Sequence, residues 1–360
     1  MVVEIVRGLG LGGTESLLAS RLRYELSAGT KRTSRVINTH SPDAFFAEAV
    51  TASGVTLDDL ATASRWTSAL RLWRIASRLS PDEAVAVHSP WPAAVLKLRR
   101  ALGLRGPRLV EVAHSTSYAR ATMLLGRLLN RHADLCIAVS AEVAAAPTTR
   151  GFRRVTVVHA GVDRERMREW IVANDDAPAR YRRELGIASS ARLAVSVGNL
   201  FADKRHSLLI RAVPRLPKDV HAVIVGDGPE LAELTELAAT LGVADRVHLL
   251  GRRPEGWTWM AVADVVAHPS AREGLPIALT EARVLGLPVV AFDVGGVSAV
   301  LGDAADAVVL DASSSAGFAD AVADVVGAAP SASHVFHARA SAPSSWDVSR
   351  FAEEFYEQVG

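Results

Sequence analysis

The sequence predicts an α/β protein built from two doubly wound domains. Short β-branched apolar runs alternate with helix-like segments along most of the 360 residues. This alternation is typical of parallel sheets covered by helices on both faces. The runs form two series separated by a polar, charged stretch at residues 164–190. Two domains of roughly 100–200 residues each account for this length.

The predicted strands of the first series lie at residues 2–6, 35–38, 84–88, 109–113, 135–139 and 155–159. Those of the second series lie at residues 193–197, 220–225, 247–249, 262–267 and 289–292. We expect the intervening stretch to be a connector with one short helix.

The end of the chain is predicted to return to the first domain. A Ser-, Ala- and Pro-rich segment at 331–345 precedes residues 346–358, whose apolar spacing is typical of a closing amphipathic helix. We therefore place the first domain at 1–165 together with 346–360, and the second at 166–345.

The composition is that of a soluble globular protein, with 49% hydrophobic and 22% charged residues. The single cysteine, Cys136, permits no internal disulfide and fits a reducing compartment. No apolar run approaches the length of a membrane span, and Glu4 interrupts the apolar core that a signal peptide needs. We expect a cytoplasmic protein.

Charge is unevenly distributed. Basic residues outnumber acidic ones over residues 1–165, and the reverse holds over 166–360. A basic first domain indicates an anionic partner. We do not expect nucleic acid, because no nucleic-acid motif with stacking aromatics is visible.

An anionic membrane surface is one interpretation of this basic domain, and a phosphate-bearing acceptor is another. Residues 65–79 read as a helix with Trp66, Leu70 and Trp73 on one stripe and arginines beside it. The alternative is a packed helix with a solvated arginine face. Further basic residues of the predicted surface are Lys97, Arg99, Arg100, Arg105 and Arg108.

A glycine-rich turn follows the first strand. Gly8, Gly10 and Gly13 match G-x-G-x-x-G, the fingerprint of a dinucleotide site. That site also needs an acidic residue at the end of the second strand, where this chain has Asn38. The remaining interpretations are backbone amides that approach an anion at a helix N-terminus, and a turn that needs glycine for steric reasons.

Further glycine turns follow predicted strands of the second domain, at Gly198, Gly226 and Gly295. Lys204 lies shortly after the first of them. In open parallel sheets, ligands bind beyond the carboxyl ends of strands, so these loops are expected to converge on one site.

The segment 268–281 carries the clearest chemical pattern. Pro276 suits the first position of a helix, which places Glu273 on the preceding loop and Glu281 inside the helix. Two carboxylates, free backbone amides and a positive helix end favour a polyhydroxy ligand carrying negative charge. In the alternative interpretation, Glu273 caps the helix and Glu281 is a solvated surface residue.

In order and spacing, these motifs resemble glycosyltransferase family 4, the retaining GT-B-fold enzymes that use nucleotide-sugar donors. The resemblance covers nearly the whole chain, including the turn at 12–15, the Gly226–Pro229 loop and the Glu273-x7-Glu281 signature. It implies two Rossmann-like domains facing across a cleft, with the last helix crossing back to the first domain.

The resemblance implies roles for the signature residues. Glu281 would hold the ribose hydroxyls of the nucleotide, and Glu273 with the Gly274 and Leu275 amides would hold donor-sugar hydroxyls. Lys204 would neutralise the departing diphosphate.

It also implies roles for the glycine loops and for two histidines. The Gly12 and Gly13 amides would approach the diphosphate. The Gly198 and Gly226 turns would line the donor site, and Arg252 would lie near the nucleotide base. His114 would face the sugar, or else be a buried structural histidine. His88 is a weaker candidate on the acceptor side.

The resemblance implies no metal and no other cofactor, because fixed cations and amide dipoles stabilise the leaving diphosphate. The nucleotide sugar is a substrate. The expected acceptor is a glycan, a lipid or a small molecule.

Two positions depart from the family pattern. Asn199 stands where the family usually has an arginine five residues before the lysine, so one phosphate-facing cation is missing unless Arg205 or Arg253 compensates. Val297 and Ser298 replace the usual Pro-Glu. The alternatives are an epimerase or phosphorylase of the same two-domain plan, and a non-catalytic nucleotide-sugar-binding homologue with a weakened phosphate site.

Overall fold

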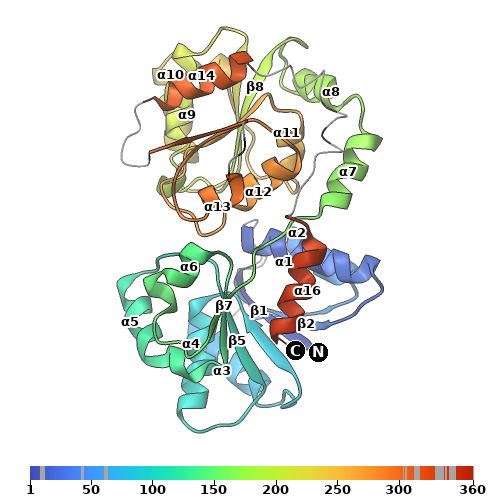
Figure 1. Ribbon diagram of the computed structural model, residues 1–360, viewed down its shortest axis with the longest axis vertical. Helices are drawn as coiled ribbons and strands as arrows, with labels where there is room; N and C mark the ends of the chain where they lie inside the picture. The colour runs from blue at the N-terminus through green and yellow to red at the C-terminus, as the bar shows by residue number, and fades with distance from the viewer. Residues whose placement is uncertain are drawn as a thin grey trace. The chain divides into compact units, whose positions relative to one another are not determined.

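The structure, a computed structural model, describes residues 1–8, 13–41, 44–60, 64–302, 304, 306–311, 317–328, 336, 339 and 346–359. The chain divides into two compact units. Unit 1 comprises Met1–Asp163 and Trp346–Gly360, and unit 2 comprises Arg164–Ser345. Each unit has a parallel sheet between layers of helices, as the sequence predicts (Figure 1).

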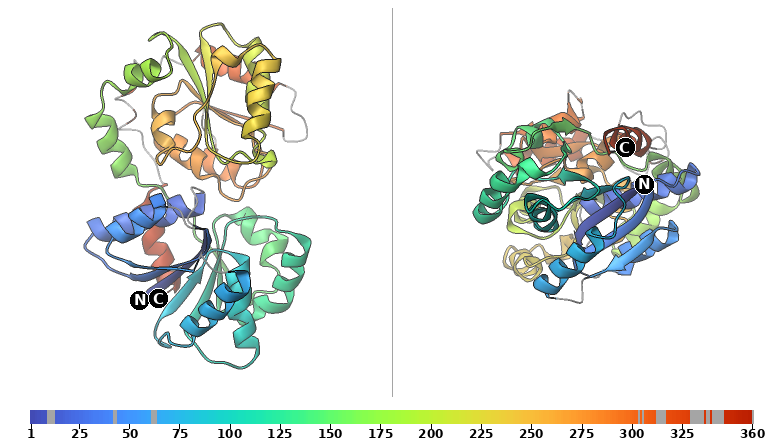
Figure 2. Two further views of the ribbon diagram at one scale, coloured as in Figure 1. Left: turned by 180° about the vertical axis from the view of Figure 1, so that it is seen from behind. Right: turned by 90° about the horizontal axis from the view of Figure 1, so that it is seen from below.

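The sheet of unit 1 runs in the order β3-β2-β1-β4-β5-β6-β7. Its strands are β1 (Val2–Gly8), β2 (Thr33–Ser41), β3 (Thr56–Asp59), β4 (Ala84–Val87), β5 (Arg108–Ala113), β6 (Leu135–Ala138) and β7 (Val155–Val157). Its helices are α1 (Gly13–Ser27), α2 (Ala44–Ala52), α3 (Arg65–Ala76), α4 (Pro90–Ala101), α5 (Arg120–Leu129), α6 (Ala141–Ala145) and α16 (Val348–Val359). Helices α1, α2 and α16 lie on one side of the sheet, and α3, α4 and α5 on the other (Figures 1 and 2).

The sheet of unit 2 runs in the order β10-β9-β8-β11-β12-β13. Its strands are β8 (Arg192–Val197), β9 (Val220–Val225), β10 (Val247–Leu249), β11 (Val265–His268), β12 (Val289–Phe292) and β13 (Ala307–Leu310). Its helices are α7 (Arg164–Ala173), α8 (Ala177–Glu184), α9 (Ser207–Ala212), α10 (Leu231–Thr240), α11 (Trp257–Ala261), α12 (Ile277–Val284), α13 (Val297–Leu301) and α14 (Phe318–Ala328). Helices α9, α10 and α14 pack together, as do α11, α12 and α13.

Three elements differ from the prediction. Strands β3 and β13 were not expected, and both are four-residue strands at the edge of a sheet. Edge strands are half-exposed, so they lack the continuous apolar run that marks a central parallel strand. The connector holds two helices, α7 and α8, instead of the one expected.

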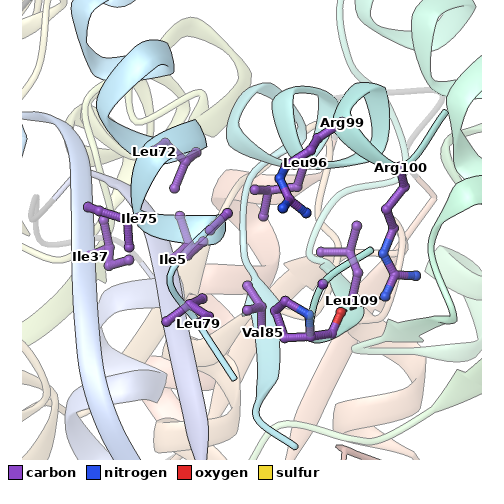
Figure 3. A pocket seen from close by; sticks show the side chains of 13 residues that line it. Ile5, Ile37, Leu72, Ile75, Leu79, Val85, Leu96, Arg99, Arg100 and Leu109 are labelled. Carbon is purple, nitrogen blue, oxygen red and sulfur yellow. Dashed lines mark hydrogen bonds between the residues drawn. The ribbon is translucent and has the colours of Figure 1, made fainter. Parts of the chain in front are cut away.

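One core of unit 1 lies between the sheet and helices α3 and α4. Ile5, Val85 and Leu109 of the strands pack against Leu72 of α3 and Leu96 of α4. A cavity of about 20 Å³ remains among these side chains (Figure 3). Because its lining is largely apolar, we interpret it as a packing defect.

Helix α16 is held on unit 1 by the chain that leads into it. Val162 and Asp347 form a parallel bridge, and the Val348 amide donates to the Val162 carbonyl at 2.9 Å. A Cβ at Gly161 would overlap the Asp347 carbonyl, so this crossing requires glycine. Helix α16 then packs its apolar face against α1. The buried residues of that face are Val348, Phe351, Ala352, Phe355, Tyr356 and Val359.

Two residues of the predicted basic surface are not on the surface. Lys97 and Arg99 of α4 are buried, because Lys97 pairs with Glu111 and Arg99 donates to the Arg105 carbonyl at 2.7 Å. The tryptophan stripe of α3, in contrast, is outward: Trp66 is 83% exposed. None of the helices within the described ranges has the length and apolar composition needed to cross a bilayer.

We predict that Phe355→Ala destabilises the protein by about 3–5 kcal/mol, because the ring is fully buried and its removal leaves a cavity. Urea unfolding followed by circular dichroism measures the change. The exposed Glu357 on the same helix gives the control Glu357→Ala, which should stay near wild type. Equal midpoints for the two variants would contradict the assignment of α16 to the core.

Candidate functional site

Loops that follow four neighbouring strands meet at one edge of the unit 2 sheet. They begin after β9, β8, β11 and β12, whose carboxyl ends point the same way. A Cβ at Gly226 would overlap the Gly198 carbonyl, and a Cβ at Gly295 would overlap that of Glu273. The glycines therefore let the backbones of successive loops touch directly.

Backbone bonds fix the loop that carries Glu273. The Gly296 amide donates to the Gly274 carbonyl at 2.9 Å, and the Ala271 amide donates to the Asp203 carbonyl at 2.7 Å. Arg272 also forms an ion pair with Asp203 at 3.5 Å. The Glu273 loop is thus tied to the neighbouring loops on both sides.

Glu273 forms the centre of a buried charged cluster. Its Oε1 accepts from Lys204 Nζ at 2.6 Å and from His268 Nε2 at 2.8 Å. Glu273 and His268 are almost fully buried, whereas the Lys204 side chain is 25% exposed. Burial would raise the pKa of Glu273, but His268 and Lys204 outweigh it and lower the pKa to about 2. Glu273 is therefore a fixed anion, and Lys204 is a cation within reach of solvent.

His206 is a second buried histidine near these loops. It is buried, and its Nδ1 lies 3.1 Å from the Ser196 hydroxyl. Burial, followed by the charge of His268, lowers the pKa of His206 to about 4. His206 is therefore neutral at pH 7 and packs near Gly198.

Arg205, one of the two arginines that could compensate for Asn199, has partners within the protein. Arg205 has φ 49°, in the left-handed region, and ends the 3₁₀ turn η3 (Ala202–Lys204). Its guanidinium donates to the carbonyls of Pro269 at 2.7 Å and Ser270 at 3.0 Å, and lies over the Phe292 ring. With these partners, the guanidinium of Arg205 binds the loop that follows β11.

Glu281 lies in α12, as expected, and is partly buried. Burial raises its pKa to about 8, with a smaller contribution from the charge of Glu255. The side chain is therefore a neutral carboxylic acid at pH 7, which can both donate and accept a hydrogen bond.

The other residues predicted to bind the nucleotide-sugar donor lie outside this cluster. Gly13 begins α1 in unit 1, while Gly12 lies outside the described residues. Asn199 is half-buried after Gly198, and Leu275 is buried beside Gly274. Arg252 is exposed in the loop after β10.

Unit 1 contains a pocket of about 560 Å³ at the carboxyl ends of β4 and β5. His88 and His114, the first residues after these strands, both line it. The opposite wall comes from α5, with Met123 and Leu129 among its residues. The pocket thus joins a polar end to an apolar wall.

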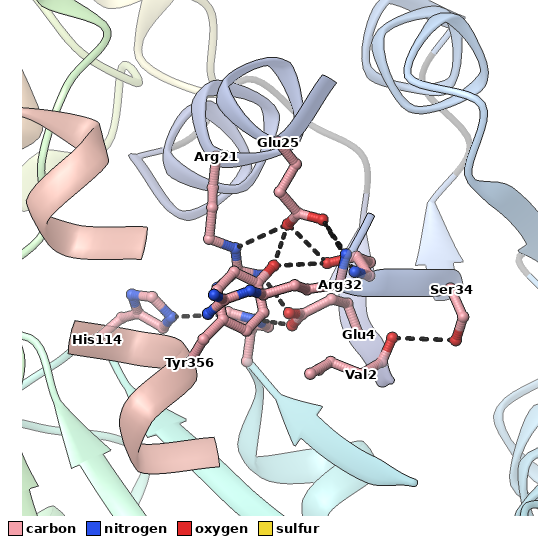
Figure 4. Close-up of polar contacts among 10 residues, drawn as sticks. Val2, Glu4, Arg21, Glu25, Arg32, Ser34, His114 and Tyr356 are labelled. Carbon is pink, nitrogen blue, oxygen red and sulfur yellow. Dashed lines mark hydrogen bonds and ion pairs between the residues drawn. The ribbon is translucent and has the colours of Figure 1, made fainter. Parts of the chain in front are cut away.

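A chain of hydrogen bonds leads from this pocket into the core. His114 Nε2 and His88 Nδ1 lie 2.9 Å apart, and His88 Nε2 lies 2.6 Å from Glu4 Oε2. Arg21 forms a buried ion pair with Glu4 (Figure 4). Sequence reasoning missed Glu4 and Arg21. The available signal was a lone carboxylate inside the apolar run of β1.

A second buried pair also lines the pocket. Lys97 Nζ pairs with Glu111 and donates to Asn130 Oδ1 at 2.6 Å. Sequence reasoning missed this pair as well, although Glu111 has the same signal, a charged residue inside an apolar strand.

Two sequence families match the chain. The family described as Glycosyltransferase Family 4 matches residues 24–166, and Glycosyl transferases group 1 matches residues 179–335. The chain belongs to the family 4 glycosyltransferases. This confirms the resemblance deduced from the motifs.

Relatives of this family 4 member include D-inositol 3-phosphate glycosyltransferases. The protein from Xylanimonas cellulosilytica is 32% identical over 173 residues, 46% of this chain and 42% of its own length. That from Mycobacteroides abscessus is 34% identical over 183 residues, 48% and 39% of the two chains. The chain therefore matches less than half the length of these relatives.

Solved structures show that the family 4 member has the GT-B fold. HepE from Anabaena, in complex with UDP-glucose, has a TM-score of 0.80, 21% identity and 99% coverage of both chains. WaaG, a glycosyltransferase of lipopolysaccharide biosynthesis, has a TM-score of 0.71 and 18% identity, and covers 100% of this chain and 99% of its own.

We predict that Glu281→Gln stabilises this family 4 protein increasingly as pH rises from about 5 to 8. Unfolded, the Glu281 carboxyl ionises near pH 4.5, but in the folded protein it keeps its proton to about pH 8. Wild-type stability therefore falls across this window, whereas neutral glutamine carries no such dependence.

Melting temperatures of both proteins at pH 5 and pH 8.5 measure this difference. The exposed Glu236 of α10 gives the control, Glu236→Gln. A constant gap between Glu281→Gln and wild type would show that burial does not perturb this carboxyl group.

Proposed function

We propose that the protein transfers a sugar, with retention of anomeric configuration, from a nucleoside-diphosphate donor to an acceptor hydroxyl. The observation that carries this proposal is the Lys204–Glu273–His268 cluster beside the glycine loops of unit 2. HepE, a protein of the same fold, was solved with UDP-glucose, so UDP-linked sugars are the first donors to test.

In this proposal the residues of the cluster have separate roles in binding the nucleotide-sugar donor. Glu273 is held as an anion by two neighbours, which suits a carboxylate that accepts bonds from sugar hydroxyls. Lys204 is positioned by Glu273 and partly exposed, so its ammonium can turn to the diphosphate as negative charge develops there. Neutral Glu281 can donate to and accept from ribose hydroxyls.

We propose that this reaction needs no metal and no other cofactor. Lys204 and the loop amides supply the positive field that a divalent ion would otherwise provide. Adding a chelator to the transferase assay tests this, and loss of activity that Mg²⁺ restores would contradict it.

A non-catalytic nucleotide-sugar-binding protein is the alternative that Asn199 favours. Asparagine supplies no charge, and Arg205 is engaged with backbone carbonyls. The family membership and the intact Lys204–Glu273 pair favour the enzyme instead.

We predict that Lys204→Ala lowers donor turnover by about 10²–10³-fold, because it removes the cation that faces the leaving diphosphate. Asn199→Arg should raise turnover by adding a second cation. The donors for this assay are selected in a thermal-shift panel of UDP-, GDP- and ADP-sugars. A ligand at ~100 times its Kd adds about 2.7 kcal/mol to the free energy of unfolding, so a donor that binds raises the melting temperature.

The matched control is Lys218→Ala, which changes an exposed lysine of the same unit. Wild-type protein that binds a donor but never hydrolyses or transfers it would favour the non-catalytic alternative. Full turnover in Lys204→Ala would remove the proposed role of this lysine.

We propose that the acceptor is bound in the 560 Å³ pocket of unit 1. His88 and His114 offer polar contacts to a hydroxyl-bearing group, and exposed Arg7 at the lining favours an anionic one. The apolar wall from α5 suits a lipid or aromatic portion. Two relatives are named for D-inositol 3-phosphate, an acceptor that combines hydroxyls with a phosphate.

We also propose that unit 1 binds an anionic membrane surface through the layer of α3, α4 and α5. Helix α5 has no buried residue, and its Leu124 and Leu128 are 61% and 69% exposed. Other exposed large apolar residues of this layer are Trp66, Leu70, Leu98, Leu102 and Leu125.

The charge of this layer complements anionic lipid. Its exposed basic residues include Arg71, Arg74, Arg78, Arg105, Arg120 and Arg127. Exposed apolar side chains and arginines on the same helices are typical of helices that lie in a membrane interface. Because α5 also forms a wall of the pocket, a lipid-linked acceptor could enter from the bilayer.

We predict that the protein sediments with vesicles containing anionic phospholipid but not with neutral phosphatidylcholine vesicles. Replacing Leu124 and Leu128 together by serine should reduce binding, and high salt should weaken it. Leu26→Ser is the matched control, since Leu26 is 58% exposed on α1, on the opposite side of the sheet. Equal losses in both variants, or no vesicle binding by the wild type, would contradict this surface.

A further inference from the structure

The serine that precedes helix α4 has a buried hydroxyl group that is available to a ligand. Ser89 is the N-cap residue of α4, with φ −149° and ψ 138°, but its side chain makes no capping hydrogen bond. Within the part of the chain that the structure describes, the hydroxyl has no other hydrogen-bond partner either. Ser89 is 8% exposed and lines the 560 Å³ pocket of unit 1.

Two prolines in the first turn of α4 limit capping by this serine. The hydroxyl of an N-cap residue usually accepts a hydrogen bond from the amide of the second or third helical residue. The third residue is Pro92, which has no N–H, and the first residue, Pro90, lacks one as well. One of the two usual capping partners is therefore missing.

Two backbone amides at the same helix end are further possible donors. The first backbone bond of α4 runs from the Ala93 amide to the Ser89 carbonyl at 3.2 Å, so earlier amides have no partner within the helix. Among the described residues, the Ser89 and Trp91 amides make no backbone hydrogen bond. Pro90, Trp91 and Ala94 line the pocket together with Ser89, so this helix end borders the pocket directly.

The charges around this end of the pocket favour an anion. Helix α4 has 12 residues, and its aligned peptide dipoles place partial positive charge at the N-terminus. Arg7, an exposed residue near the end of β1, lines the same pocket. The carboxylate of Glu111 also lines it but is paired with Lys97. The positive helix end and Arg7 therefore remain to attract a ligand.

We propose that the N-terminus of α4 is a phosphate subsite of this pocket. The Ser89 hydroxyl and the Ser89 and Trp91 amides donate hydrogen bonds to a phosphate monoester, and Arg7 adds a charge-assisted bond. Three donors at one helix end suit the three terminal oxygens of a phosphate monoester, whereas a carboxylate has two. That the phosphate belongs to the acceptor rests on the proposed function, but the binding of phosphate does not.

Binding is measured by NMR of full-length protein labelled with ¹⁵N-serine and ¹⁵N-tryptophan, in phosphate-free buffer without donor. Inositol monophosphate is the probe, and uncharged inositol is its control. Ser89→Thr and Trp91→Phe variants identify the two amide signals. We expect both amide signals to move downfield and to saturate with the phosphate only. Binding of inositol monophosphate that moves neither amide, or no saturable binding, would overturn the proposal.

Ser89→Asp separates ligand binding from helix capping. Aspartate is as good an N-cap residue as serine, and its charge suits a helix N-terminus, so the melting temperature should not fall. The same charge repels phosphate, so the affinity for inositol monophosphate should fall at least about tenfold, the scale of one lost hydrogen bond to a charged group. Wild-type affinity in folded Ser89→Asp would exclude phosphate from this helix end.

Ser89→Ala keeps the test decisive if Ser89→Asp does not fold. It removes the hydroxyl without adding charge, so affinity should again fall about tenfold, and unchanged affinity would contradict the proposal. Ser89→Thr keeps the hydroxyl and should keep most of the affinity. The matched control is Ser64→Asp at the N-cap of α3, where the serine hydroxyl accepts from the Thr67 amide at 3.3 Å. This control should leave phosphate binding unchanged.

Two further probes decide which molecule carries the phosphate. Vesicles containing phosphatidylinositol phosphate present the same monoester on a lipid headgroup. Vesicle binding that Ser89→Asp weakens would place that headgroup in the subsite, and vesicle binding that this variant leaves unchanged would restrict the subsite to soluble esters. If UDP displaces inositol monophosphate and moves the same two amides, the subsite belongs to the donor, and the assignment to an acceptor is overturned.

The proposed function and this inference fail separately. Because no transfer is measured, the phosphate titration stands whether or not a donor is turned over. Conversely, sugar transfer to an uncharged acceptor by a protein that does not bind inositol monophosphate would contradict the phosphate subsite alone.

Discussion

Charges taken out of water must be paired, and this requirement fixes how helices lie on both sheets. Arg21 of α1 pairs with Glu4, Lys97 of α4 with Glu111, and Arg182 of α8 with Asp264. Every side chain in these pairs is at most 8% exposed. Losing one partner of such a pair typically costs about 3–5 kcal/mol of stability. Each pair therefore fixes the position of its helix relative to the strands. Apolar packing alone would tolerate small shifts.

The same requirement organises the two candidate sites. In unit 2 a cation and a histidine, Lys204 and His268, share the carboxylate of Glu273. In unit 1 the cation and the histidine that share Glu4 are Arg21 and His88. In the first case the cation reaches solvent, and in the second it is sealed under aromatic rings, with Arg21 3.9 Å from the centre of the Phe355 ring. The arrangement in unit 2 thus presents its cation to solvent, and the arrangement in unit 1 keeps its cation buried.

The fold was largely predictable because central parallel strands are buried on both faces and read as apolar runs. The edge strands β3 and β13 lack that signal and were missed. Glycine loops and the Glu273–Glu281 spacing predicted that the unit 2 loops meet, because the carboxyl ends of parallel strands share one edge. The roles of these residues stay predictions.

Other parts of the sites depend on strand order and side-chain direction, which spacing does not encode. Glu4 and His88 meet only because β1 and β4 are neighbours, although 84 positions separate them. Arg205 follows Lys204 directly, but the two cations have different partners. The backbone of Arg205 is left-handed, and its guanidinium donates to the Pro269 and Ser270 carbonyls. A sequence pattern lists the cations but does not show which of them is already engaged.

The bridge between Val162 and Asp347 has an evolutionary consequence. Unit 2 is an insertion into unit 1, and the chain leaves and re-enters unit 1 at two adjacent, hydrogen-bonded residues. A gene segment encoding unit 2 can therefore be exchanged at two junctions without cutting any strand of the unit 1 sheet. Recombination at these junctions would pair one form of unit 1 with different forms of unit 2. The close contact at Gly161 makes that glycine the residue that such an exchange has to keep.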